Sequence, residues 1–120
     1  MNSPVINYDE TSDTLYISFI PNVKATGIEL NDHILLRIDK GNRQAVGLTF
    51  LNYSILIQKA DFGPRSFLLA GLARLSEETR EMVMEIMGNS PVKEILSLST
   101  FTPSFSEALP ITLLHLPQPA

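Results

Sequence analysis

Two aspartates are the first side chains in this sequence whose spacing suggests chemistry. Asp9 and Asp13 lie in the stretch YDETSDTLYISF, which runs from Tyr8 to Phe19. Paired carboxylates can bind a divalent cation or share general acid–base work. They can also build a tight turn, because short carboxylate side chains accept hydrogen bonds from nearby backbone amides. The sequence favours the turn, with Asp9 capping a single helical turn and Asp13 closing its other side.

A second polar pair, Asp32 and His33, follows the apolar segment that ends at Leu30. In an antiparallel sheet both polar groups would fall at the same end, with their turns about 10 Å apart, or two strand spacings. A calcium ion needs ligands at about 2.3–2.6 Å, so the two turns could not share one ion without a further fold of the backbone. The sequence indicates no catalytic residue, no cofactor and no metal ligand set. The candidate site for a small ligand or a metal is Asp9, Asp13, Asp32 and His33.

Strands predicted from period-two alternation must position these groups. Apolar and polar residues alternate over residues 5–8, 15–20, 27–30, 34–39 and 45–51. Asn31-Asp32 and the segment 39–43 have turn composition, and such short connections favour antiparallel neighbours. We therefore expect an antiparallel β-meander of about five strands, packed on one face by helices.

Helix signals lie further along the chain. Asn52 is a candidate N-cap for a short helix over residues 53–60, and Ser76 caps a stronger helix over residues 77–87. Pro91, at a favoured first position, predicts another helix. Residues 65–75 also indicate a helix, although a glycine interrupts it. Together with the strands, these helices predict an α+β fold.

The last segment, residues 99–120, is rich in proline but also in large apolar residues, which a free linker would not carry. Residues 111–116 predict a strand, and the rest an extended C-terminal arm. The whole chain, 1–120, is thus expected to be a single domain. It would consist of the meander with a short helix over 1–60, a helical region over 61–98 and the Pro-rich arm over 99–120.

Composition excludes several classes of function. Nine Lys and Arg face thirteen Asp and Glu, for a net charge of -4, and the absence of a basic run argues against a nucleic-acid partner. The chain has no cysteine, so it has no disulfide, thiolate nucleophile or zinc–thiolate site. The first residues do not have the pattern of a signal peptide, and no apolar run is long enough to span a bilayer. We therefore expect a cytoplasmic protein with no membrane partner.

Two motifs in the first half of the chain are shared with a known family. Residues 8–17 read YDETSDTLYI, which is Tyr-Asp, three variable residues, Asp, one variable residue and Leu-Tyr-Ile. Residues 46–51 read VGLTFL and precede a helix-capping residue. Both motifs resemble a small bacterial family catalogued as a domain of unknown function, number 2283. His33 departs from the family pattern, where a small residue is common, and the chain from about Gly63 onward lies outside it.

The resemblance implies a compact β-rich module with no established activity. Some family members are encoded beside small toxin-like proteins, which implies an antitoxin-like binder of a neighbouring-gene protein as one alternative. A small-ligand or metal-dependent domain at the acidic strand end is another. An apolar content of 44% is generous for so small a body and favours self-association. We therefore expect a non-enzymatic, homo-oligomeric interaction module, a dimer or higher, with interface candidates Tyr16, Leu35, Phe101, Phe105, Leu113 and Leu116.

Overall fold

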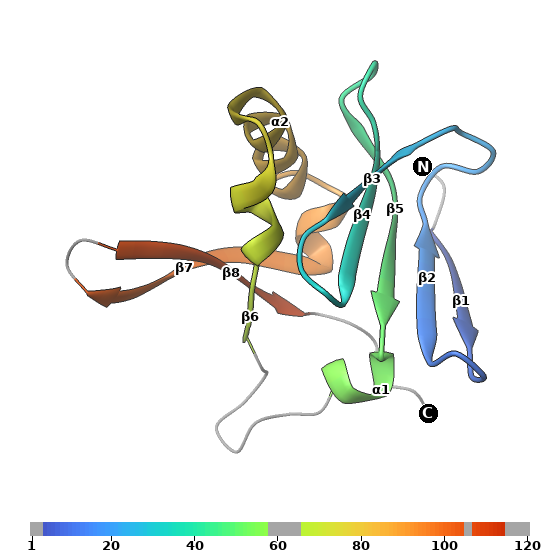
Figure 1. Cartoon of the computed structure of the whole chain (residues 1–120). Helices are drawn as coiled ribbons and strands as arrows, with labels where there is room; N and C mark the ends of the chain where they lie inside the picture. Colours follow the sequence, from blue (N-terminus) through green and yellow to red (C-terminus); the bar gives the residue numbers. More distant parts are fainter. Residues whose placement is uncertain (1–3, 58–65, 105–106, 115–120) are drawn as a thin grey trace.

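A computed structural model of the chain describes residues 4–57, 66–104 and 107–114 (Figure 1). Five strands form a first sheet in which all neighbouring strands are antiparallel. They are β1 (Val5–Asp9), β2 (Thr14–Ser18), β3 (Thr26–Glu29), β4 (Ile34–Asp39) and β5 (Gln44–Leu51). The predicted five-stranded antiparallel sheet and the α+β class are confirmed.

The order of the strands, β1-β2-β5-β4-β3, differs from that of a simple meander. Strands β3, β4 and β5 follow one another as hairpins, but β5 then pairs with β2 and so lies in the middle of the sheet. The chain between β2 and β3 therefore crosses to the opposite edge. The physical reason lies in β5 itself. Six of its eight residues, 45–50, are buried, and a strand that is buried on both faces is best accommodated between two neighbours.

Helical elements pack on one face of the first sheet, and the hydrophobic core lies between them and the sheet. The covering elements are α1 (Tyr53–Leu56), the 3-10 helix η1 (Ala70–Arg74) and α2 (Glu77–Met87). Ser76 caps α2 as predicted, because its hydroxyl oxygen accepts a hydrogen bond from the Thr79 amide at 3.2 Å. The core contains side chains of the sheet and of all three covering elements, among them Leu15, Ile17, Leu36, Leu48, Phe50, Tyr53, Leu72, Val83, Ile86 and Met87.

Two predicted helices are reduced in the structure to short 3-10 helices. Residues 66–75 form β6 (Ser66–Leu68) and η1, while Pro91 leads into a 3-10 helix, η2 (Val92–Glu94), and then β7 (Leu96–Ser104). Within its described part, the region 61–98 therefore contains a single α-helix, α2. Short apolar runs do not distinguish a strand from a buried helix by periodicity alone, which is why the sequence misled here. No helix of the described residues has the length and apolar character needed to cross a membrane.

A second antiparallel sheet has the order β6-β8-β7, with β8 at Glu107–Leu114. Strand β8 includes residues 111–114 of the predicted strand but begins earlier. Because β7 and β8 pair with each other, the described part of the predicted arm is a β-hairpin instead of a single extended segment. Figure 1 shows this hairpin running past β6, away from the first sheet.

Gly71 is where the second half of the chain meets the edge of the first sheet. Its amide donates a hydrogen bond to the carbonyl oxygen of Leu30 at 2.9 Å. A Cβ atom at position 71 would collide with the carbonyl oxygen of Glu29 and would lie 3.0 Å from the carbonyl carbon of Leu30. Only glycine permits this approach, which covers the outer edge of β3 with η1.

Gly71→Ala should therefore lower the free energy of unfolding by about 1–3 kcal/mol, because the added methyl group forces two backbone segments apart. Urea unfolding at equilibrium measures the change. Gly88→Ala is the matched control, since a Cβ atom there would lie 3.4 Å from its nearest neighbour, the carbonyl oxygen of Met84. Equal stabilities of the Gly71 variant and the wild type would refute the close approach.

Candidate functional site

Asp13 connects the β1–β2 turn to the start of α1. Its carboxylate accepts hydrogen bonds from the Tyr8 hydroxyl at 2.6 Å, the Ser54 hydroxyl at 2.6 Å and the Ser54 amide at 3.0 Å. Its backbone carbonyl accepts one from the Tyr53 amide at 2.9 Å. Asp13 has a positive φ of 53°, a conformation that aspartate tolerates better than most residues. We call Tyr8, Asp13 and Ser54 the Asp13 network.

The Asp13 network shifts the protonation of its members. The Ser54 hydroxyl, and after it the Tyr8 hydroxyl, hold the pKa of Asp13 below its usual value because both stabilise the carboxylate. The same bond to Asp13 raises the pKa of Tyr8 to about 12. Asp13 is therefore charged at neutral pH with its oxygens already engaged. This favours anchoring over general acid–base work, which needs a pKa near the working pH.

Asn52 occupies the N-cap position of α1 as predicted, but its side chain makes no capping hydrogen bond. Asn52 has a φ of 57°. Its Oδ1 atom lies instead 3.1 Å from Nδ1 of His33. The amide of Ser54, in the first turn of α1, donates a hydrogen bond to the carboxylate of Asp13, which lies in a turn far away in the sequence. A local capping pattern carries no information about such a distant acceptor.

The other predicted site residues lie in turns. Asp9 accepts a hydrogen bond from the Thr11 amide at 3.0 Å, which supports its predicted role as a turn residue. The turn that carries His33 is held by Asn31, whose Oδ1 accepts the amides of His33 and Ile34, each at 2.8 Å. The exposed Asp32 makes no hydrogen bond or ion pair with any residue that the structure describes.

All four candidate residues lie at one end of the sheet, as the register of β2 and β4 on β5 requires, but they form no common site. Asp13 and His33 contact the junction of β5 and α1 through different partners, Ser54 and Asn52. Across residues 4–57, 66–104 and 107–114, no group of three or more His, Asp or Glu side chains could hold a metal ion.

The face of the first sheet opposite the core, which we call the open face, carries a row of residues paired across four strands. Tyr16 pairs with Thr49, Thr49 with Leu35, and Leu35 with Glu29. Neighbouring rows add apolar side chains from β1 and the end of β5. The exposed fractions are 41% for Tyr16, 44% for Leu51 and 65% for Val5.

A cation lies on the open face beside this row. Arg37 pairs in register with Gly47, and its guanidinium lies across that glycine so closely that a Cβ atom at position 47 would collide with it. The Nε atom of Arg37 is buried and has no hydrogen-bond partner. Among the described residues, the ion pair of the structure is Arg43–Glu85, at 2.9 Å, and does not involve Arg37.

The remaining interface candidates lie in the second sheet or beyond the described chain. Leu113 is half-buried in β8, where it pairs with Ser97 of β7. Phe101 belongs to β7. Phe105 and Leu116 lie outside the described residues.

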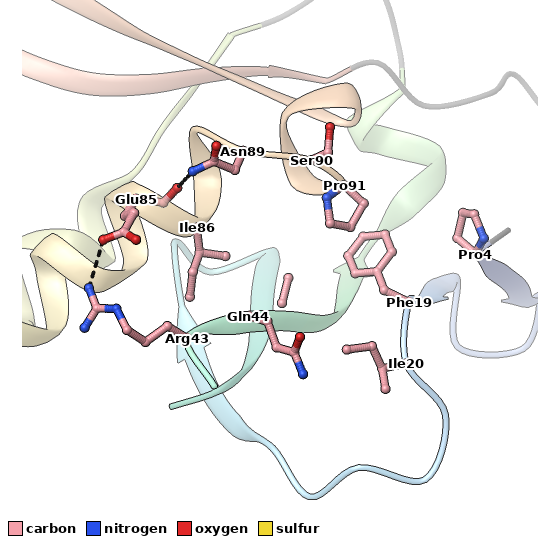
Figure 2. Close-up of a pocket in the computed structure, with 11 residues that line it drawn as sticks. Pro4, Phe19, Ile20, Arg43, Gln44, Glu85, Ile86, Asn89, Ser90 and Pro91 are labelled. Carbon is pink, nitrogen blue, oxygen red and sulfur yellow. Dashed lines mark hydrogen bonds and ion pairs between the residues drawn. The ribbon is translucent and has the colours of Figure 1, made fainter. Parts of the chain in front are cut away.

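A pocket of about 530 Å³ opens at the other end of the first sheet (Figure 2). Phe19, which follows β2, faces Pro91, and Ile20 and Ile86 add apolar side chains to the lining. The ion pair between Arg43 and Glu85 closes one side and is about half exposed. None of the four predicted site residues lines this pocket. The residues that line this pocket come from separate segments, so no local sequence motif predicts it. Its lining suits a small apolar group.

Comparison with known proteins supports the resemblance seen in the sequence. Residues 5–54 match the family described as "Protein of unknown function (DUF2283)", which confirms the resemblance over the first half of the chain. The match begins at the first residue of β1 and ends at Ser54, so it contains the whole Asp13 network and the whole open face. No curated protein and no solved structure matches the chain.

Asp13→Asn should lower the midpoint of urea unfolding at neutral pH, because a neutral amide is a weaker acceptor for Ser54 and Tyr8. The pKa of Asp13 is lower in the folded state than in the unfolded state. Its carboxylate therefore stabilises the folded protein at pH values above 3.8, the ordinary pKa of an aspartate. That stabilisation is lost as the pH falls through the folded-state pKa.

The difference between wild type and Asp13→Asn should therefore shrink on acidification, which urea unfolding at a series of pH values measures. Asp32→Asn is the matched control, because Asp32 is exposed and makes no hydrogen bond in the described chain. A difference that stays the same from neutral to acidic pH would show that the charge of Asp13 is not what the network uses.

Proposed function

We propose that this protein is a non-enzymatic interaction module that forms a homodimer through its open face. The observation that carries this proposal is the row of Tyr16, Thr49, Leu35 and Glu29, in which the partly exposed side chains of Tyr16 and Leu35 flank the buried Thr49. The core and the covering helices use only the opposite face of the sheet.

The composition of the open face supports an interface rather than a solvated surface. A solvated face of an antiparallel sheet normally carries polar side chains at alternate positions. Here Tyr16, Leu35 and Leu51 occupy such positions on three adjacent strands. Thr49, which pairs with Tyr16 on one side and with Leu35 on the other, is only 8% exposed. Contiguous apolar surface of this kind is typical of protein–protein contacts.

A second copy of the chain is the occupant that the charges on this face favour. The face carries both a cation, Arg37, and an acid, Glu29. A surface with both signs can be complementary to itself about a two-fold axis, which is the commonest symmetry of homo-oligomers. An acidic or a basic partner protein would match only one of the two charges.

Binding also suits the described side chains better than catalysis. The carboxylate of Asp13, which lies at the acidic strand end, is already engaged by Tyr8 and Ser54. Nδ1 of His33 lies 3.1 Å from Oδ1 of Asn52, and His33 forms no ion pair with a carboxylate among the described residues. An antitoxin-like protein would use the same open face for a different chain, so the oligomeric state of the pure protein separates the two ideas.

Light scattering coupled to size exclusion should report a dimer of the purified wild type. Tyr16→Glu should raise the dissociation constant of that dimer at least tenfold, because it buries a charge in place of a central aromatic contact. The control is Ile55→Glu on α1, since Ile55 is 50% exposed and lies outside the open face.

A wild type that is monomeric at every concentration would overturn the proposal. Equal effects of the Tyr16 and Ile55 substitutions would also count against it, because the open face would then have no special part in assembly.

A further inference from the structure

We propose that Arg37 and Glu29 form two reciprocal ion pairs across the dimer, with Arg37 of each copy binding Glu29 of the other. This inference rests on the proposed function, because it names the polar contacts of the same open face. It assigns a role to an arginine and a glutamate that have no side-chain partner within the described chain.

Arg37 is an unsatisfied group on the surface that a second copy would cover. Its side chain is half-buried, and the buried Nε donates to nothing. Buried donors without a partner are rare and costly, and a guanidinium is best matched by a carboxylate that accepts two parallel N–H bonds. The Arg43–Glu85 ion pair shows the pairing that Arg37 lacks.

Glu29 is the acid on the open face that is available for this purpose. It is exposed and has no side-chain hydrogen bond or ion pair in the described chain. The other two acids that the strands of this face carry are already used in turns, and Asp32, which also lines the hollow beside Glu29, belongs to the turn after β3. Asp9 accepts the Thr11 amide, and Asp39 accepts the Asn42 side chain at 2.7 Å and the Gly41 amide at 3.1 Å.

Arg37 and Glu29 do not satisfy each other within one chain. The guanidinium of Arg37 lies over Gly47 of β5, on one side of β4. Glu29 lies on β3, on the other side of β4, where it pairs with Leu35. The cation and the acid are therefore displaced in opposite directions from the central Leu35.

This displacement suits a two-fold axis near Leu35. Such an axis places the guanidinium of one copy against the carboxylate of the other, and the same contact then forms twice. A hollow of about 330 Å³, lined in part by Glu29, Leu35, Thr49 and Leu51, provides room beside the acid for the incoming group. Gly47 keeps the cation in place because any larger residue would push the guanidinium off the strand.

Charge reversal tests the pairing. In Arg37→Glu, all four positions of a homodimer are acidic, and in Glu29→Arg all four are basic. Each variant alone should therefore dimerise at least tenfold more weakly than the wild type. An equimolar mixture of the two should form heterodimers, because every contact then joins opposite charges. The double variant, Arg37→Glu with Glu29→Arg, should recover dimerisation.

The matched controls are Arg43→Glu and Glu85→Arg, which change the net charge by the same amounts but lie at the pocket of Figure 2. Neither should weaken the dimer by more than about twofold, because exposed ion pairs contribute little. Sedimentation velocity measures all six proteins, and circular dichroism verifies that each is folded.

The outcomes separate this inference from the proposed function. If the wild type is a dimer but both reversals leave its dissociation constant unchanged, or if the mixture forms no heterodimer, the ion pairs are refuted and the dimer stands. If the wild type is monomeric, both ideas fall. Should a reversal variant prove unfolded, Arg37→Gln and Glu29→Gln replace it. Each would be expected to weaken the dimer, and wild-type affinity in both would refute the pairing.

Discussion

The structure depends on the central position of β5. This strand pairs with β2 on one side and with β4 on the other, and its residues 45–50 are buried. The central position of β5 determines the strand order and requires the connection after β2 to cross to the far edge of the sheet. It also places the turns before β2 and β4 at the end of the sheet where β5 leads into α1. The contacts of Asp13 and His33 with Ser54 and Asn52 are consequences of that arrangement.

Local sequence patterns predicted those parts of the fold that have local causes. Alternation located β2, β3, β4 and β5 because each of these strands has one face in the core, whereas all five residues of β1 are exposed. The cap at Ser76 was predictable because cap and amide lie three residues apart. The pairing of β2 with β5 was not predictable from hairpin signals, since it joins segments distant in the chain. The helix predicted over residues 65–75 was not found, for a related reason. The glycine that seemed to interrupt a helix is required by a backbone contact with β3, from the other half of the chain.

The candidate site shows the same division. The sequence correctly favoured a turn for Asp9 and Asp13, because aspartates beside small polar residues readily accept hydrogen bonds from nearby backbone amides. It could not predict Ser54 as the partner of Asp13, nor that Asn52 would turn toward His33. The open face was foreseen through Tyr16 and Leu35, which alternate with core residues. The position of Arg37 could not be predicted, because nothing in the sequence reveals that Gly47 leaves room for its guanidinium.

The contact of Gly71 with Leu30 also limits how copies of this sheet could be joined edge to edge. On the β3 side, η1 occupies the edge, and the Gly71 amide takes the Leu30 carbonyl that lies just beyond the strand. On the other side, β1 has no strand beyond it among the described residues, and all five of its residues are exposed. A sheet with one available edge can pair with the same edge of one further copy, and the resulting pair has no available edge. Strand addition to the first sheet would therefore end at two molecules, because the contact that covers β3 leaves β1 as the one edge of that sheet open to pairing among the described residues.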